Sequence, residues 1–335
     1  MNSYERVMNR FAGKPVDRIP NFSIVMMFAA KQMGITYKEY LTDYRKLTDA
    51  VIYCHEQFGI DVLSAISDSM REAEGFGYKV NLHDDGTEEI LERVINDICD
   101  IKKLKLFDPY SSKRTYDRIQ AVGLLKEKAC GAIPVMGWVE GALAQSCDVM
   151  PMQEVFVNLF DEPEAIKELL EICAEEEILF AKAQIDAGAD IIGIGDSVSS
   201  LVGPDLFRDF SFPYLKKIID AVHEKGALAK LHICGNITAV LDQVALTGAD
   251  MIDFDYMVDM EKGAEIIPKN VCICGNIDPV AVVLEGNPEL IKKEVKRCAS
   301  LSRLNNNCIA PGCEIPRDTD PANVLAIQEA IEEIG

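Results

Sequence analysis

Basic side chains are scarce in this 335-residue sequence: 34 Lys and Arg stand against 55 Asp and Glu, a net charge of −21. Nucleic acids and anionic membrane surfaces are bound through clustered basic residues. We therefore expect neither as a partner. The acidic residues are spread over segments of helical period such as 171–179, which indicates solvated helix faces. The one basic cluster, at 111–118, is interpreted as an exposed helix start in preference to a docking site.

Long apolar runs and paired cysteine motifs are also missing. No apolar segment approaches the roughly 18 residues of a membrane span, and the first residues lack the apolar core of a signal peptide. The 11 cysteines are odd in number and have no compact spacing, which favours free thiols in a reducing compartment. We expect a cytoplasmic protein. The absence of GxGxxG and GxxxxGK[ST] motifs argues against a dinucleotide or ATP enzyme.

Short apolar runs alternate with longer segments of helical period. The phrases "AGADIIGIGD", "KGALAKLHICG" and "TGADMIDFD" repeat one order: helix end, glycine, short strand, then a polar residue. This order is typical of βα units whose strands open onto one face. It predicts an α/β fold, a single (β/α)8 TIM barrel over residues 1–335 with an N-terminal helical extension; an open doubly wound sheet is the alternative. The expected strands are Asn21–Met27, Asp61–Ile66, Ile133–Val139, Asp190–Ile194, Leu228–Ile233, Met251–Phe254, Val271–Cys274 and Asn307–Ala310.

The stretch "AKLHICGN" contains one of only four histidines. Side chains two residues apart on a strand point to the same side, so His232 and Cys234 face the same way. An imidazole nitrogen and a thiolate sulfur are two of the ligands that zinc prefers. The alternative is a buried histidine satisfied by a neighbour, beside a cysteine that acts as a small apolar residue.

A third sulfur ligand is expected after the last strand, where Cys313 lies in the "APGCEIP" loop. Three protein ligands with an open fourth position are the catalytic pattern of zinc, whereas closed structural sites of four cysteines carry paired CxxC motifs. Cys272 and Cys274 in "VCICGN" remain competing sulfur ligands.

Carboxylates follow several of the expected strands and are candidates for contact with a metal or substrate. Asp196 and Asp278 have the sequence surroundings of helix caps. Asp255 and Glu140 are the better candidates for a catalytic role, and water or either of these carboxylates would serve as the fourth zinc ligand. Asp253 has no assigned role beyond a cap or an ion pair.

Two segments carry a resemblance to a known family. The stretch "GIGDSVSSLVGPDLFRDFSFPYLKKIIDAVHEKG" and the later "CGNIDPVAVVLEGNPEL" resemble the uroporphyrinogen decarboxylase superfamily, across roughly the last 150 residues. That resemblance implies a single (β/α)8 barrel. The decarboxylases grip substrate carboxylates with an N-terminal arginine motif, but no arginine occurs here from Ile19 to Tyr44. Cys313 also stands where the decarboxylases tend to carry a histidine.

His232, Cys234 and Cys313 resemble the His-x-Cys…Cys zinc motif of another branch, the methylcobamide:coenzyme M methyltransferases. The resemblance implies an enzyme that binds zinc, a methyl-corrinoid (methylcobamide) protein as partner, a small-molecule thiol or similar acceptor, and a possible homodimer. The hypothesis is therefore a zinc-dependent corrinoid methyltransferase. The alternatives are transfer from a methoxylated or methylamine substrate onto a corrinoid protein, a metal-free decarboxylase, and a corrinoid-binding barrel without activity.

Overall fold

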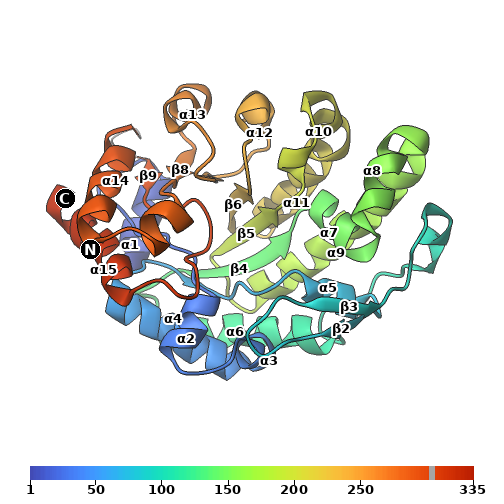
Figure 1. Ribbon diagram of the computed structural model, residues 1–335, viewed down its shortest axis with the longest axis horizontal. Helices are drawn as coiled ribbons and strands as arrows, with labels where there is room; N and C mark the ends of the chain where they lie inside the picture. The colour runs from blue at the N-terminus through green and yellow to red at the C-terminus, as the bar shows by residue number, and fades with distance from the viewer. Residues whose placement is uncertain (302–305) are drawn as a thin grey trace.

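The computed structural model describes residues 1–301 and 306–335 and is built on a curled sheet of seven parallel strands (Figure 1). The strands lie side by side in the order β1-β4-β5-β6-β7-β8-β9. Every neighbouring pair is parallel, so all the carboxyl ends lie at one edge of the sheet. The strands are β1 (Leu63–Ser64), β4 (Val135–Glu140), β5 (Ile191–Asp196), β6 (Leu228–Ile233), β7 (Met251–Phe254), β8 (Cys272–Cys274) and β9 (Asn307–Cys308).

The central strands are buried on both faces, as their apolar sequences predict. All six residues of β4 and all six of β5 are buried. Trp138 on β4 lies opposite Gly193 on β5, where an added Cβ would come within 2.2 Å of the indole ring. Gly193, the first glycine in "IIGIGD", therefore makes room for the single tryptophan inside the curl of the sheet.

Seven of the eight expected strands are present, but the first, Asn21–Met27, is not a strand. Only Asn21 forms a bridge, to Ile309. The Phe22 amide donates to the Ile309 carbonyl at 2.8 Å, and the Asp61 amide donates to the Asn21 carbonyl at 2.8 Å. This short segment thus lies between β9 and β1.

The α/β class and the curled parallel sheet are confirmed, but a closed barrel of eight strands is not, because the segment at Asn21 contributes a bridge and not a strand. The physical reason lies in the chemistry of the segment itself. Pro20 has no amide hydrogen to donate, and the Asn21 amide donates to the Asp61 side chain in place of a neighbouring strand. The chain then turns into helix α2 at Met27.

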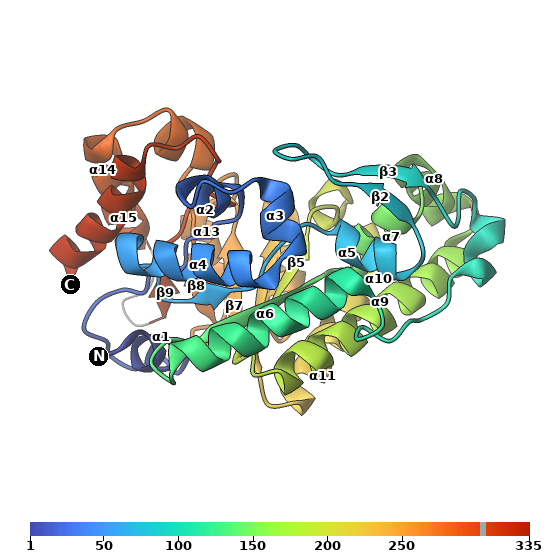
Figure 2. The ribbon, with the colours of Figure 1, turned by 90° about the horizontal axis from the view of Figure 1, so that it is seen from below.

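Long helices cover the outer side of the sheet (Figure 2). The helix ends expected before Gly188 and Gly226 belong to α9 (Pro163–Asp186) and α11 (Phe212–Glu224), which pack against each other. Both end as expected before glycines of positive φ, +118° at Gly188 and +84° at Gly226. The other helices are α1 (Ser3–Phe11), α2 (Met27–Gln32), α3 (Tyr37–Thr42), α4 (Tyr44–Phe58), α5 (Met70–Gly75), α6 (Lys113–Ala129), α7 (Ala142–Val149), α8 (Met152–Asp161), α10 (Pro204–Phe210), α12 (Leu241–Val244), α13 (Met260–Ile266), α14 (Pro288–Leu301) and α15 (Pro321–Ile334), with short turns η1 (Ile98–Lys103), η2 (Ser199–Leu201), η3 (Thr238–Val240) and η4 (Pro279–Leu284).

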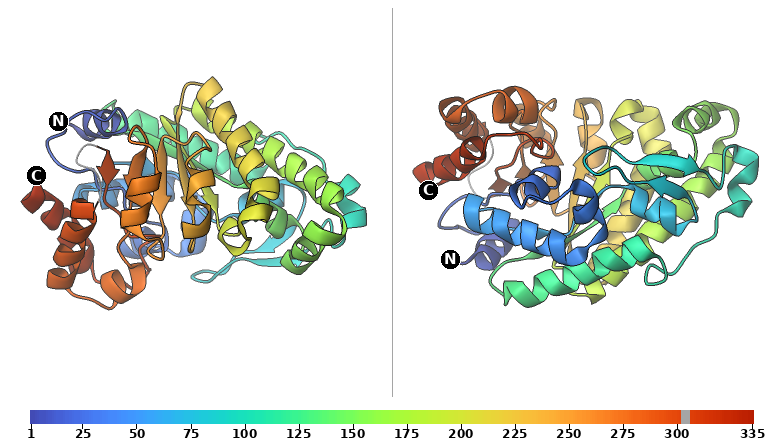
Figure 3. Two further views of the ribbon diagram at one scale, coloured as in Figure 1. Left: turned by 90° about the horizontal axis from the view of Figure 1, so that it is seen from above. Right: turned by 60° about the horizontal axis from the view of Figure 1, so that its bottom comes forward.

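Two features lie outside the expected alternation of strands and helices. An antiparallel hairpin of β2 (Lys79–Asn81) and β3 (Glu89–Glu92) follows α5. The two chain termini lie near each other, beside the paired helices α14 and α15 (Figure 3). Within the described residues, no helix has both the length and the apolar character needed to cross a membrane.

Candidate metal centre

A cavity of about 230 Å³ opens at the carboxyl end of the sheet. Strands β4 and β5 end here in Glu140 and Asp196, and β6 leads here through His232 and Cys234. The loop that follows β9 brings Cys313 to the same cavity. Because parallel strands present all their carboxyl ends at one edge, side chains far apart in the sequence meet at this place.

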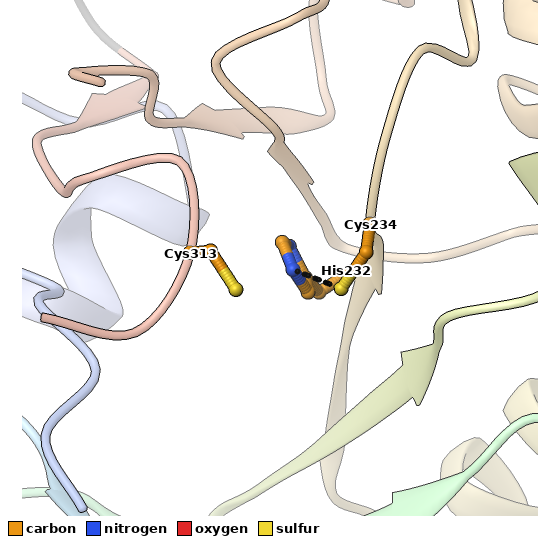
Figure 4. Close-up of side chains that lie close together, drawn as sticks. All are labelled: His232, Cys234 and Cys313. Carbon is orange, nitrogen blue, oxygen red and sulfur yellow. Dashed lines mark hydrogen bonds between the residues drawn. The ribbon is translucent and has the colours of Figure 1, made fainter. Parts of the chain in front are cut away.

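The structure brings His232, Cys234 and Cys313 together. One ligand atom from each residue lies within 4.8 Å of the others, and they form the one such group found among the described residues (Figure 4). His232 and Cys234 point the same way from the end of β6, and their Nε2 and Sγ atoms are 3.2 Å apart. Cys313 approaches from a loop on the opposite side.

The position of Cys313 depends on close packing of its loop. Pro311 pairs with Ile277, and the Gly312 amide donates to the Ile277 carbonyl at 2.8 Å. A Cβ on Gly312 would come within 2.2 Å of the Tyr256 amide nitrogen. Glycine at this position is therefore required for the "PGC" turn to lie against the loop after β7 and to direct Cys313 toward the histidine.

His232 is oriented by groups behind it. Its Nδ1 atom is 3.2 Å from the Asp253 carbonyl oxygen and 3.5 Å from the Asp253 Oδ2 atom. Lys230 Nζ lies 2.5 Å from the same Oδ2 atom, and all three side chains are buried. Oxygen acceptors beside Nδ1 favour a proton on that nitrogen, so a neutral His232 would leave Nε2, which faces the two thiols, free to bind a metal.

The protonation of the three groups is linked. Burial by itself would lower the pKa of His232, but the contacts with Cys313 and Asp253 outweigh it and the pKa is raised. The hydrogen bond from Cys234, together with that from His232, lowers the pKa of the Cys313 thiol to about 4. The pKa of Cys234 is raised by the same hydrogen bond and by burial. One thiolate, on Cys313, is therefore favoured before any metal binds.

The two candidate catalytic carboxylates lie in different surroundings. Glu140 lines the cavity, and burial raises its pKa well above the ordinary value in spite of its contact with Arg71. Asp255 is buried beside the cavity without lining it, and its Oδ1 atom accepts from the Met257 amide at 2.9 Å. Of the two, Glu140 is the one placed to contact a bound molecule.

The cap-like aspartates accept hydrogen bonds from backbone amides of their own loops. Asp196 accepts from the amides of Val198 and Ser199 and from the Ser199 hydroxyl. Asp278 accepts from two amides at the start of η4.

The competing cysteines lie away from the three-ligand group. The Cys272 Sγ atom is 3.8 Å from the Cys308 Sγ atom, and Cys274 contacts Asp253. Neither belongs to the group of close ligand atoms described above.

Several residues of the site were not expected from the sequence: Lys230, the role of Asp253, Asp68 and Glu314. Lys230 did carry a signal, because a lysine two residues before His232 in an apolar strand lies on the same face as His232 and Cys234. Asp68 and Glu314 had no comparable signal. They reach the cavity only through the loops after β1 and β9.

A buried imidazole and two thiols at the carboxyl edge of a curled parallel sheet define an α/β protein with a candidate metal centre. The chain matches the family model "Uroporphyrinogen decarboxylase (URO-D)" over residues 2–334, so it belongs to that family. Methylcobamide:CoM methyltransferase MtbA of Methanosarcina acetivorans is 30% identical over 333 residues, 97% of this chain and 96% of the relative.

Two further comparisons agree with that match. Methylcobamide:CoM methyltransferase MtaA of Methanosarcina barkeri is 26% identical over 338 residues, 98% of this chain and 97% of the relative. A solved structure described as a methyltransferase from Methanosarcina mazei has a TM-score of 0.91 at 24% identity, covering 100% of this chain and 99% of that one; it supports the fold alone. The resemblance found in the sequence is confirmed: within the uroporphyrinogen decarboxylase family, the chain groups with the methylcobamide:CoM methyltransferases.

Proposed function

We propose that this protein is a zinc-dependent methyltransferase that moves a methyl group between a methyl-corrinoid protein and a small thiol acceptor. The observation that carries the proposal is the convergence of His232, Cys234 and Cys313, with ligand atoms within 4.8 Å, in a cavity at the carboxyl end of the sheet. The full-length similarity to methylcobamide:CoM methyltransferases supports the corrinoid as methyl carrier.

The donor set suits zinc. One imidazole nitrogen and two thiolates match its ligand preference and leave a fourth position for a substrate. The Asp253 contact that holds His232 Nδ1 is the kind of outer contact found behind zinc-binding histidines. When bound, zinc would lower the pKa of a coordinated acceptor thiol and present it as a thiolate at neutral pH.

The residues of the chain would then bind and orient the acceptor. His232, Cys234 and Cys313 hold the metal, and two protein thiolates leave little net charge on it, so the acceptor sulfur stays nucleophilic. Trp138 and Met26 line the cavity and exclude water from the reacting sulfur. In the transfer, the acceptor sulfur gains the methyl group and loses its proton, and the electron pair of the broken cobalt–carbon bond remains with the corrinoid.

Replacement of Cys313 by serine tests the assignment. Cys313→Ser removes one thiolate ligand, so we expect zinc content to fall from about one per chain to well below it and methyl transfer from methylcobalamin to thiols to reach background. Zinc is measured by plasma mass spectrometry on protein purified without oxygen, and transfer by the change in the corrinoid absorption spectrum.

The matched control is Cys54→Ser, which makes the same change in a buried cysteine on α4, outside the three-ligand group. The control is expected to keep both zinc and activity. Zinc and turnover at wild-type levels in Cys313→Ser would overturn the assignment, as would equal losses in the two variants with both still folded by circular dichroism.

A further inference from the structure

The ionisable side chains that line the cavity outside the metal group are all acidic. Four carboxylates face it, from Asp68, Glu140, Asp196 and Glu314. Among the described residues, the lining contains no lysine and no arginine; His232 is its one basic side chain, and that imidazole belongs to the metal group. An anionic ligand would therefore lose its water at this place without gaining a cation.

The arginines that contact the lining carboxylates Glu140 and Asp68 are already engaged by protein groups. Arg71 pairs with Glu72 at 2.9 Å and with Glu140 at 3.4 Å, and it also donates to backbone carbonyls. Arg114 pairs with both oxygens of Asp68 and with Glu74 at 3.1 Å. Neither guanidinium is left to receive a sulfonate or carboxylate from a substrate.

Glu140 is the lining carboxylate that is open to a ligand. Both oxygens of Asp68 and both of Asp196 accept hydrogen bonds from the protein. Glu314 accepts from the Met27 amide through Oε1. The Glu140 side chain accepts a hydrogen bond from Arg71 through Oε1, and its Oε2 atom lies toward Gly195, where an added Cβ would be 3.1 Å away. Glu140 is only 9% exposed, and burial raises its pKa, so its ionised form is favoured only when a cation lies close to it. A positive group of a ligand would supply that cation, and its attraction would be poorly screened.

We propose that the acceptor is a small thiol whose other end carries a positive charge, an ammonium group, which pairs with Glu140 while the sulfur lies at His232, Cys234 and Cys313. The proposal rests on the proposed function and narrows its substrate class. It differs from the acceptor named for the methylcobamide:CoM methyltransferase relatives, because coenzyme M ends in a negatively charged sulfonate. A cavity of about 230 Å³ suits a molecule of this size.

Three thiols with the same two-carbon skeleton provide the test: cysteamine, 2-mercaptoethanol and 2-mercaptoethanesulfonate, which end in a positive, a neutral and a negative group. Their binding to zinc-loaded protein is measured by calorimetry without corrinoid, and their methylation is measured with methylcobalamin. We expect cysteamine to bind about tenfold or more tightly than the sulfonate, a difference of about 1.4 kcal/mol. Binding of the sulfonate as tight as that of cysteamine would overturn the proposal.

The role of Glu140 is tested with Glu140→Gln, which keeps the shape and removes the charge. The dissociation constants of cysteamine and 2-mercaptoethanesulfonate, expected to differ about tenfold or more in the wild type, should become about tenfold closer to each other in this variant. Intrinsic differences in thiol acidity cancel, because the same pair of thiols is compared on both proteins. Glu265→Gln, at an exposed position of α13, is the control and should leave the ratio unchanged. If Glu140→Gln does not fold, the comparison of the three thiols on the wild-type protein still decides the proposal.

Failure of this proposal and failure of the proposed function are separable. Methylation of all three thiols at similar efficiency, or an unchanged ratio in the folded Glu140→Gln variant, would overturn the charge assignment and leave the methyltransferase standing. If the purified protein contains no zinc and methylates none of the three thiols, the proposed function is overturned, and the proposed substrate class with it.

Discussion

At the scale of single residues, the candidate site depends on a charge pair buried behind the metal group. Lys230 and Asp253 are 0% and 1% exposed at their side chains, and Asp253 also contacts the Nδ1 side of His232. Burying two charges costs free energy that their attraction only partly offsets. We infer that the pair orients the histidine more than it stabilises the fold.

Replacement of Asp253 by asparagine tests this role. Asparagine can still accept from His232 Nδ1, but it removes the negative charge beside the ring and leaves Lys230 without its ion-pair partner. We expect zinc affinity to fall by about 10–100-fold, the usual effect of changing a residue that holds a zinc-binding histidine. Competition with a chromogenic chelator measures the affinity. Asp242→Asn, an exposed aspartate after β6, should bind zinc like the wild type; unchanged affinity in a folded Asp253→Asn variant would contradict the role.

At the scale of elements, helix α9 carries carboxylates on its buried face. Glu176 is 0% exposed; its Oε2 atom accepts from the Phe107 amide at 3.2 Å, and its Oε1 atom has no hydrogen-bond partner. Burial raises the pKa of Glu176 to about 8 from an ordinary value of 4.5. The folded protein therefore holds a proton that the unfolded chain releases at lower pH.

The stability of the protein should depend on pH through this group. Because the folded-state pKa is raised, the contribution of Glu176 is fully present below about pH 4.5 and is lost as pH rises through about 8. Each pKa unit corresponds to about 1.4 kcal/mol, so Glu176→Gln should be more stable than the wild type at pH 8 by a few kcal/mol and similar near pH 5. Urea unfolding at the two pH values measures the difference. Glu175→Gln, at the adjacent exposed position, keeps Glu176 and should therefore follow the wild type at both pH values. A Glu176→Gln variant that also follows the wild type at both values would contradict the prediction.

At the scale of the whole molecule, the two ends of the sheet meet around Asp61. This side chain is fully buried and accepts from Arg6 at 2.8 Å, from Arg18 at 2.6 Å and from the Asn21 amide at 2.9 Å. Helix α1, the segment between β9 and β1, and the start of β1 are thus tied to one carboxylate. These polar contacts add to the few backbone hydrogen bonds that the segment makes with β9 and with Asp61, where a closed barrel would have a full strand.

Asp61→Asn should weaken the contacts that join the two ends of the sheet without changing the metal site at the other end of the strands. Removing the buried partner of two arginines is expected to lower the free energy of unfolding by about 3 kcal/mol, while zinc content stays at about one per chain. Denaturant unfolding and metal analysis on the same preparation check both. Asp17→Asn removes a more exposed partner of Arg6, 39% exposed at its side chain, and should cost less than about 1 kcal/mol. A loss of zinc in folded Asp61→Asn would show that the two ends are not independent.

The sequence by itself determined much of the local structure. Seven strands and the helices α9 and α11 follow from apolar period and glycine stops, because burial and backbone conformation at those positions depend on neighbours in the chain. His232 and Cys234 were likewise readable, since residues two apart on a strand share a face. Cys313 was proposed as their partner from its place after the last strand and from family resemblance, and its role as a ligand stays a prediction.

Only the tertiary structure decided the surroundings of these residues. The contacts of Asp253 with His232, the carboxylates that surround the cavity, and the use of Asp61 in place of an eighth strand all join segments distant in the chain. Such contacts follow from how strands curl and loops pack, which no local pattern encodes. The charge that a ligand meets in the cavity depends on such contacts. An arginine can bind an anionic ligand only when it is not already paired with a protein carboxylate.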